Sequence, residues 1–485
     1  MGNSRGKSIG LNAIINGLKT IISLVFPLIT IPYVTKILGV ENLGRYTYSH
    51  SIIDYFYLTA GLGVSTYAVR ESARYRESKD SFSRFASEVF SINFFSTIIS
   101  YLCLIVLLVV AQRLRNYASI ILVLSVSMIF TTLGCEWVYI INEEFLYITV
   151  RTILFQLLSL ILMFLFVRNE NDVLWYAIIV VISNSGSCIV NAIGIRRYCS
   201  LTIVFDKRIL VHIAPILILF ANSIATRIYV NSDVTILGLL TSDYQVGIYT
   251  VSSKIYSITK QVLSAIIIVS IPRLSHLWSN KKNNEFKELA NGIVNVLTII
   301  VVPAVVGLFC LSEQVVLLIS SQDYISAYTS LRLLCIALLF CLYNWFFTSS
   351  ILIPCGREKK VLFATVLSAL INVILNIILI PFLKENAAAF TTAIAEALSL
   401  IICVYNSKDI FRAKFRIMDI VSCLLGCAMI ILACLYIKML QLSNLVTILS
   451  AICTSVVLYF STLLICKNRT LFRFVSILKQ RLYKT

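Results

Sequence analysis

The sequence predicts an all-α, polytopic membrane protein with about fourteen transmembrane helices, arranged as two parallel-repeat lobes of six helices each and two further C-terminal helices. Three observations support this fold class. The chain of 485 residues is 59% hydrophobic and only 13% charged, with a mean hydropathy of +0.90. Apolar runs recur along its whole length, and a motif from its first part returns in its second part. An ordinary soluble domain has about twice this share of charged residues.

The apolar runs are long enough to cross a bilayer, for which a helix needs about 20 residues. They are continuously apolar and do not alternate with polar residues, so they are not the strands of a β-barrel. The runs lie at 11–38, 46–69, 86–110, 117–141, 146–167, 173–194, 210–240, 246–270, 289–311, 328–352, 361–382, 387–405, 419–437 and 445–466. The runs 11–38 and 210–240 are long enough to be tilted or bent.

A short motif recurs at a constant offset of about 200 residues, which indicates an internal duplication. The matching positions are Gly44, Tyr46, Thr47, Ser49 and Ile52 with Gly247, Tyr249, Thr250, Ser252 and Ile255. The two copies fall on the second and eighth predicted helices. An even number of helices separates them, so both copies enter the membrane in the same orientation. We therefore expect one lobe at 1–208, a second at 209–407, and two extra helices with a basic tail at 408–485.

The net charge of +18 follows the predicted topology. Most Lys and Arg residues lie in alternate connections, together with the two ends of the chain. Few lie in the other connections, and these are Arg113, Arg115, Arg168, Lys384 and Lys438. This asymmetry is the positive-inside rule, and it predicts that both termini are cytoplasmic. The basic balance therefore reflects topology, and we expect no nucleic-acid partner.

No pattern in the sequence predicts an enzyme, a cofactor or a metal site. Most of the 14 Cys lie within the predicted spans, where Cys acts as a small hydrophobic residue. The three His are too scattered for a zinc site. No glycine-rich phosphate loop follows a strand, which argues against an ATP-driven pump. A membrane-embedded glycosyltransferase or polymerase would need a catalytic acid or a large polar loop, and the connections are short.

The first predicted helix carries a polar stripe. Its members recur every three or four residues and are Asn12, Asn16, Lys19, Ser23, Pro27 and Thr30. A polar stripe on a spanning helix must face protein or water, because lipid cannot satisfy it. The Asn residues either bond neighbouring helices or line a cavity. For Lys19 we expect a water-filled cavity, because a charge inside a bilayer costs several kcal/mol.

Four cations lie deep within predicted helices, namely Lys19, Arg227, Lys254 and Lys260. If helices 1, 2, 7 and 8 line the contact between the lobes, these cations converge on one cavity. Tyr249 and Tyr256 form a stripe with Lys260, which suits sugar stacking beside a phosphate, although Tyr also marks membrane interfaces. Three further cations sit nearer to helix ends and are expected to extend to the interface, and these are Lys36, Arg45 and Arg151.

Intramembrane acids are fewer than cations, and the main ones are Asp54, Asp233 and Glu396. Asp233 has two open interpretations: a structural ion pair with Arg227 or Lys254, or coupling to a proton or sodium ion. Glu396 is a second candidate for ion coupling. An excess of intramembrane cations favours a secondary transporter of an anionic solute. An ion-coupled multidrug antiporter is the alternative, but it exports cations and should carry acids in its cavity.

Several motifs, in their order along the chain, resemble those of bacterial oligosaccharide repeat-unit flippases. The first are Phe26-Pro27-Leu28-Ile29-Thr30-Ile31-Pro32-Tyr33-Val34, Leu38-Gly39, Gly61-Leu62-Gly63 and Tyr67-Ala68-Val69-Arg70-Glu71. Later ones are Asp233 with Leu237-Gly238, Ile353-Pro354, Asn372, Asn376, Ile380-Pro381, Ala387 to Ala389, Thr392-Ala393 and Glu396. One departure occurs here: a glycine that usually precedes the alanine pair is absent, and Asn386-Ala387 stands in its place. The resemblance covers about residues 8–406.

The resemblance implies the polysaccharide transporter branch of the multidrug/oligosaccharidyl-lipid/polysaccharide (MOP) superfamily, with a fold like that of the multidrug (MATE) transporters. Its substrate would be an undecaprenyl-diphosphate-linked repeat unit for O-antigen, capsule or exopolysaccharide, moved across a bacterial cytoplasmic (inner) membrane by alternating access. A peptidoglycan precursor or a teichuronic acid unit is an alternative cargo. Implied partners are the lipid-linked oligosaccharide, membrane lipid, a polysaccharide polymerase and a chain-length regulator.

Overall fold

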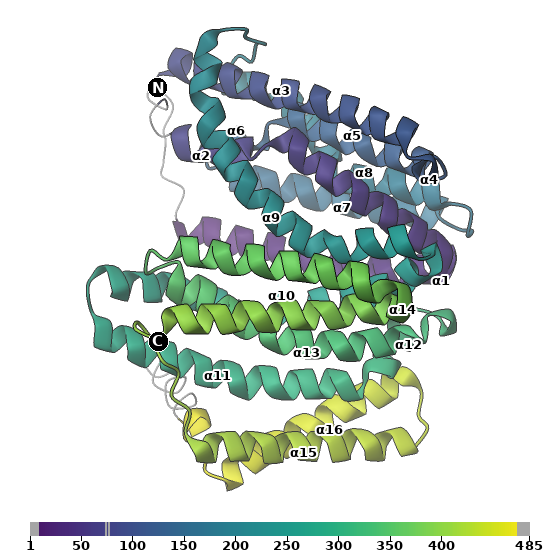
Figure 1. Ribbon diagram of the computed structural model, residues 1–485, viewed down its shortest axis with the longest axis vertical. Coiled ribbons are helices and arrows are strands. Elements are labelled where there is room, and N and C mark those ends of the chain that lie inside the picture. Colours follow the sequence, from purple (N-terminus) through teal and green to yellow (C-terminus); the bar gives the residue numbers. More distant parts are fainter. Residues whose placement is uncertain (1–8, 73–74, 76–77, 473–485) are drawn as a thin grey trace. The chain divides into compact units, whose positions relative to one another are not determined.

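A computed structural model describes residues 9–72, 75 and 78–472, and helices are the only regular secondary structure within these ranges (Figure 1). The chain divides into two compact units, Met1–Thr235 and Ile236–Thr485. The predicted division into two lobes and an appendage at 408–485 stays a prediction.

Within its described residues, the first unit contains nine α-helices and two short 3₁₀ helices, and the last α-helix runs past the unit boundary. They are α1 (Ile9–Gly61), α2 (Val64–Glu71), α3 (Lys79–Val110), α4 (Gln112–Arg115), α5 (Ala118–Gly134), α6 (Glu136–Ile141), α7 (Phe145–Phe166), α8 (Val173–Gly194), η2 (Ile195–Arg197), η3 (Lys207–Ile209) and α9 (Leu210–Leu240). A buried cluster at one end of the unit joins α2, α3, α6 and the start of α9, and includes Tyr67, Phe85, Trp137 and Ile216.

The second unit begins within α9 and contains seven further α-helices. These elements are α10 (Asp243–Ser279), α11 (Asn283–Cys310), α12 (Ser312–Ile319), η4 (Gln322–Tyr324), α13 (Ala327–Trp345), the π-helix η5 (Phe346–Leu352), α14 (Glu358–Ser407), α15 (Ile417–Met439) and α16 (Asn444–Ile465). One core joins α10, α11, α13, η5 and α14, and includes Phe286, Leu297 and Phe346. A second core joins α11, α15 and α16, where the Tyr459 hydroxyl donates to the Ile299 carbonyl at 2.8 Å.

Nine helices of the described chain are long and apolar enough to span a membrane, or ten if the bent pair Lys207–Ala221 and Thr226–Leu240 is one span. The protein is therefore an all-helical, multi-pass membrane protein. The predicted count of fourteen is larger for physical reasons. α1 contains two predicted runs, α14 contains another two, and the predicted run 117–141 is divided between α5 and α6. The finer count stays a prediction.

The two longest helices each contain one residue with a non-helical backbone. In α1 this residue is Gly39 (φ 70°, ψ 176°), a positive φ that glycine adopts without steric cost. In α14 it is Lys384 (φ 52°, ψ −130°), close to the place where the sequence lacks an expected glycine. Hydrogen bonds from Thr391 to Asn376 (2.5 Å) and from Asn372 to Thr391 (3.4 Å) join the two halves of α14. α14 is therefore a helical hairpin (Figure 1).

Candidate functional site

In the first unit, polar side chains of α1 and α9 face each other around Asp54. The Arg227 Nη1 atom lies 3.9 Å from Asp54 Oδ2, and the His50 Nδ1 atom lies 3.5 Å from the same oxygen. The Asn231 amide donates to it at 3.0 Å. Arg227, His50 and Asn231 thus surround one carboxylate oxygen, and Asp54 is the acid that Arg227 contacts.

The same face of α9 continues one turn beyond Asn231. Thr235 donates to the Ser51 hydroxyl at 3.2 Å, and the Tyr55 hydroxyl lies 3.2 Å from Thr235 Oγ1. Arg227, Asn231 and Thr235 are spaced four residues apart, so they lie on one face of the helix. Within a spanning segment, such a face must be satisfied by protein or water. The hydrogen bonds show that side chains of α1 are the polar partners of this face.

In the second unit, Lys260 of α10 lies beside an aromatic ring. Its Nζ atom is 5.8 Å from the ring centroid of Tyr256, within the range of a cation–π contact. Cys341 of α13 and Glu396 of α14 lie within electrostatic range of it. Glu396 is buried and accepts a hydrogen bond from Asn344 at 3.4 Å. In the described part of the chain no ion pair joins Lys260 to Glu396. The acid is therefore near the lysine but does not contact it directly.

The other predicted site residues have different surroundings. Lys254 is exposed, and six residues of helix separate it from Lys260, so the two leave α10 in directions roughly 120° apart. Tyr249 is buried with 3% exposure, and Asp233 is buried with 6% exposure. The backbone of Lys19 belongs to α1, but its side chain lies outside the residues that the structure describes, as do those of Asn12, Asn16 and Ser23. The predicted convergence of all four cations therefore stays a prediction.

Buried charged groups also occur where the sequence did not point. Arg151 was expected to extend to the interface, and this expectation is wrong: the side chain is 4% exposed and lies 3.3 Å from Glu136. Its guanidinium also lies 5.5 Å from the Tyr147 ring centroid. The physical reason is that an acid on the neighbouring short helix α6 lets the charge stay inside the protein.

A second unexpected cluster joins α2, α3 and α9. His212 Nε2 lies 3.0 Å from Glu88 Oε2, and its Nδ1 atom lies 2.7 Å from the Tyr67 hydroxyl. All three side chains are buried. In the sequence this cluster is visible only as a Glu and a His within separate apolar helices. Nothing in that pattern predicts that the two helices are neighbours.

Comparison with known proteins identifies the family. Residues 9–278 match the family described as polysaccharide biosynthesis protein, and residues 218–378 match the family described as MatE. Residues 9–278 are more than half of the chain. They include Lys19, Arg227, Lys254 and Lys260, and also Asp54.

Similar curated proteins include a probable low-salt glycan biosynthesis flippase, Agl15, of Haloferax volcanii. It is 26% identical over 213 residues, covering 42% of this chain and 43% of that protein. A putative O-antigen transporter of Shigella dysenteriae is 23% identical over 269 residues, covering 54% of this chain and 66% of that protein. The match thus spans 43% to 66% of the length of these relatives.

Among solved structures, the lipid II flippase MurJ in an inward closed conformation has a TM-score of 0.74. It shares 18% sequence identity, and the match covers 92% of this chain and 98% of that one. At this identity the likeness defines the fold. The family match confirms the predicted resemblance to polysaccharide transporters. The chain belongs to the polysaccharide biosynthesis protein family.

Proposed function

We propose that this protein is a flippase that moves undecaprenyl-diphosphate-linked oligosaccharide repeat units from the cytoplasmic leaflet to the outer leaflet. The observation that carries this proposal is the family match over residues 9–278, the segment in which all four intramembrane cations lie. The named relatives are a glycan biosynthesis flippase and an O-antigen transporter. The glycan would serve O-antigen, capsule or another exopolysaccharide.

In this proposal the cations bind the diphosphate. Arg227 offers a guanidinium fork, while Lys19, Lys254 and Lys260 act as point charges. Tyr256, which lies against Lys260, would stack on a sugar ring next to the phosphate. Tyr249 is buried, so we leave it out of the proposed contact set. Asp233 and Glu396 remain the proposed ion-coupling acids, and the buried position of Glu396 near Lys260 supports that role.

The membrane potential favours the loaded step. A diphosphate diester carries about two negative charges, and each is worth ~2.3 kcal/mol per 100 mV, so an inside-negative potential favours outward movement by about 4.6 kcal/mol. Coupling to an ion is then not strictly required for the loaded step. Alternating access would follow from movement of the two lobes.

The proposed topology has about fourteen spans with both termini in the cytoplasm of a bacterial cell, counting each half of α1 and α14 as one span. A polysaccharide polymerase and a chain-length regulator are the proposed protein partners. This arrangement places the connections rich in Lys and Arg on the side where the lipid-linked unit is made.

The test is translocation by the purified protein in liposomes. A fluorescent, polyprenyl-diphosphate-linked oligosaccharide should become accessible to a membrane-impermeant quencher faster in proteoliposomes than in empty liposomes. Excess unlabelled lipid-linked oligosaccharide should slow this rate. If the labelled lipid moves no faster than in empty liposomes, the proposal is wrong. Transport of cationic dyes alone would instead support a multidrug antiporter, for which the acids Asp54, Asp233 and Glu396 are the favourable observation.

A further inference from the structure

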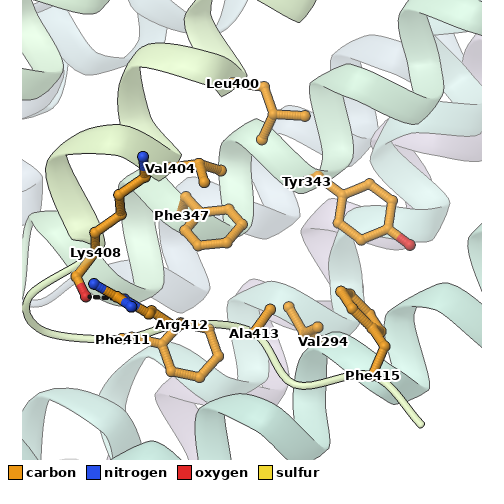
Figure 2. Close-up of a pocket in the computed structure, with 10 residues that line it drawn as sticks. All are labelled: Val294, Tyr343, Phe347, Leu400, Val404, Lys408, Phe411, Arg412, Ala413 and Phe415. Atoms are coloured by element: carbon orange, nitrogen blue, oxygen red, sulfur yellow. Dashed lines mark hydrogen bonds between the residues drawn. The ribbon is translucent and has the colours of Figure 1, made fainter. Parts of the chain in front are cut away.

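A cavity of about 540 Å³ lies within the second unit, and none of the residues of the proposed diphosphate site lines it (Figure 2). It is lined by α11, α13, η5, the end of α14 and the segment 408–415 that follows α14. The walls are mainly aromatic and aliphatic, from Phe347, Leu400, Val404 and Phe411. Cavities of roughly 300–1,000 Å³ with such a lining bind small apolar groups. The cavity therefore suits a hydrocarbon chain.

Two exposed cations, Lys408 and Arg412, lie at one edge of this cavity (Figure 2). Arg412 Nε donates to the Lys408 carbonyl at 3.1 Å, which places the two residues side by side. The Lys408 Nζ atom lies 4.6 Å from the Tyr405 ring centroid. Over the described ranges, neither cation forms an ion pair. An apolar cavity with two unneutralised cations at its edge is complementary to a molecule with an anionic head and an apolar chain.

Hydrogen bonds fix the segment that carries these cations. At its start, Arg357 forms an ion pair with Asp409 and donates to the Asn406 carbonyl at 2.6 Å. At its other end, the Lys414 amide donates to Asn291 Oδ1 at 2.7 Å. The cavity edge is thus held on both sides, so a ligand meets a preformed site and loses less free energy to ordering.

The location of the segment identifies the kind of ligand. Residues 408–416 connect α14 to α15, and both helices are apolar enough to span the membrane. A short connection between two spans lies at the membrane–water interface, the depth at which lipid phosphates lie. Basic residues at this depth attract anionic lipids.

We propose that this cavity binds one anionic phospholipid of the surrounding membrane. The lipid phosphate contacts Lys408 and Arg412, and one acyl chain enters between Phe347, Val404 and Phe411. The cavity volume is in the range that holds a drug-sized ligand, so it fits a single acyl chain rather than a whole polyprenyl tail. No residue of the proposed diphosphate site lines this cavity, so the inference does not depend on the transported cargo.

The experiment measures lipid binding to the purified full-length protein by native mass spectrometry. The probes are phosphatidylglycerol and phosphatidylcholine of the same chain length. We expect one phosphatidylglycerol to bind in preference to phosphatidylcholine. The double variant Lys408→Ala/Arg412→Ala should lower the phosphatidylglycerol affinity roughly tenfold, because two interfacial charges are lost. The matched control is Arg196→Ala/Arg197→Ala, which removes two exposed cations of the first unit that do not line the cavity and should leave binding unchanged.

A second variant tests the cavity without changing charge. Ala413→Phe places a ring in the cavity, and it should also reduce phosphatidylglycerol binding while circular dichroism shows unchanged helix content. Equal binding by the wild type and both cavity variants overturns the proposal. So does equal binding of the two lipids. Displacement of phosphatidylglycerol by a polyprenyl diphosphate would overturn it as well, because the occupant would then be the cargo lipid.

Discussion

The two units differ in what surrounds their charged side chains. In the described part of the first unit, three buried or half-buried cationic or His side chains lie beside an acid. The pairs are Arg151 with Glu136, His212 with Glu88, and Arg227 with Asp54, at 3.3, 3.0 and 3.9 Å. In the second unit two cations of spanning helices lie over aromatic rings. Lys260 lies 5.8 Å from the Tyr256 centroid, and Arg332 lies 4.8 Å from the Tyr328 centroid.

This difference separates structural charges from charges that are available to a ligand. An acidic partner cancels most of the positive field of a cation, whereas an aromatic ring stabilises the cation and leaves its net charge in place. Lys260 therefore suits an anionic cargo better than Arg227 does. The buried pairs Arg151–Glu136 and His212–Glu88 are expected to contribute mainly to stability. Three experiments can break or sharpen this comparison.

The largest effect is expected for Glu136→Ala in the first unit. This change leaves the nearly buried Arg151 without its acid, and removing one partner of a buried pair costs about 3 kcal/mol of unfolding free energy. Chemical unfolding of the purified protein in detergent measures this loss. The control Glu170→Ala removes an exposed acid and should change stability by less than about 0.5 kcal/mol. Equal stability of both variants would show that the pair is not structural.

A smaller effect, on transport, is expected from Lys260→Ala. Loss of one charge-assisted contact to a phosphate is worth about 1.5–3 kcal/mol, so the translocation rate in proteoliposomes should fall at least about tenfold. Arg227→Ala should lower the rate less, since Asp54 already neutralises part of its charge. Lys260→Arg should retain most activity. A larger loss for Arg227→Ala than for Lys260→Ala would reverse the ranking that the comparison predicts.

The smallest effect is expected on the pH dependence of stability, from the ion pair between Arg357 and Asp409. This pair belongs to the second unit and lies outside the spanning segments. The Arg357 hydrogen bond holds the pKa of the Asp409 carboxyl below its usual value. A lowered folded-state pKa gives stability that is present above the unfolded-state pKa of about 4 and is lost as the pH falls through the folded-state pKa. Thermal unfolding of the wild type and Asp409→Asn should therefore differ at neutral pH and converge in acid. A constant difference down to acid pH would contradict this.

The helical spans were the most predictable feature of the chain, since each needs only a local run of apolar residues. The contacts of the site were less predictable because they join distant positions. Asp54 was recognised as an intramembrane acid, but its contact with Arg227 requires that α1 and α9 be neighbours. Glu88 and His212 are 124 residues apart. Arg151 was misplaced because its distance from the helix end suggested the interface, whereas the nearby Glu136 holds it inside.

The one-residue break at Lys384 limits how α14 tolerates insertion. Because the two halves of the hairpin meet without a loop, an added residue there would rotate the second half by roughly 100°. Thr391 would then leave Asn376, and Glu396 would leave the side of the helix that approaches Lys260. Epitope tags should instead be inserted in the longer connections between helices, where added residues do not change the orientation of the next helix.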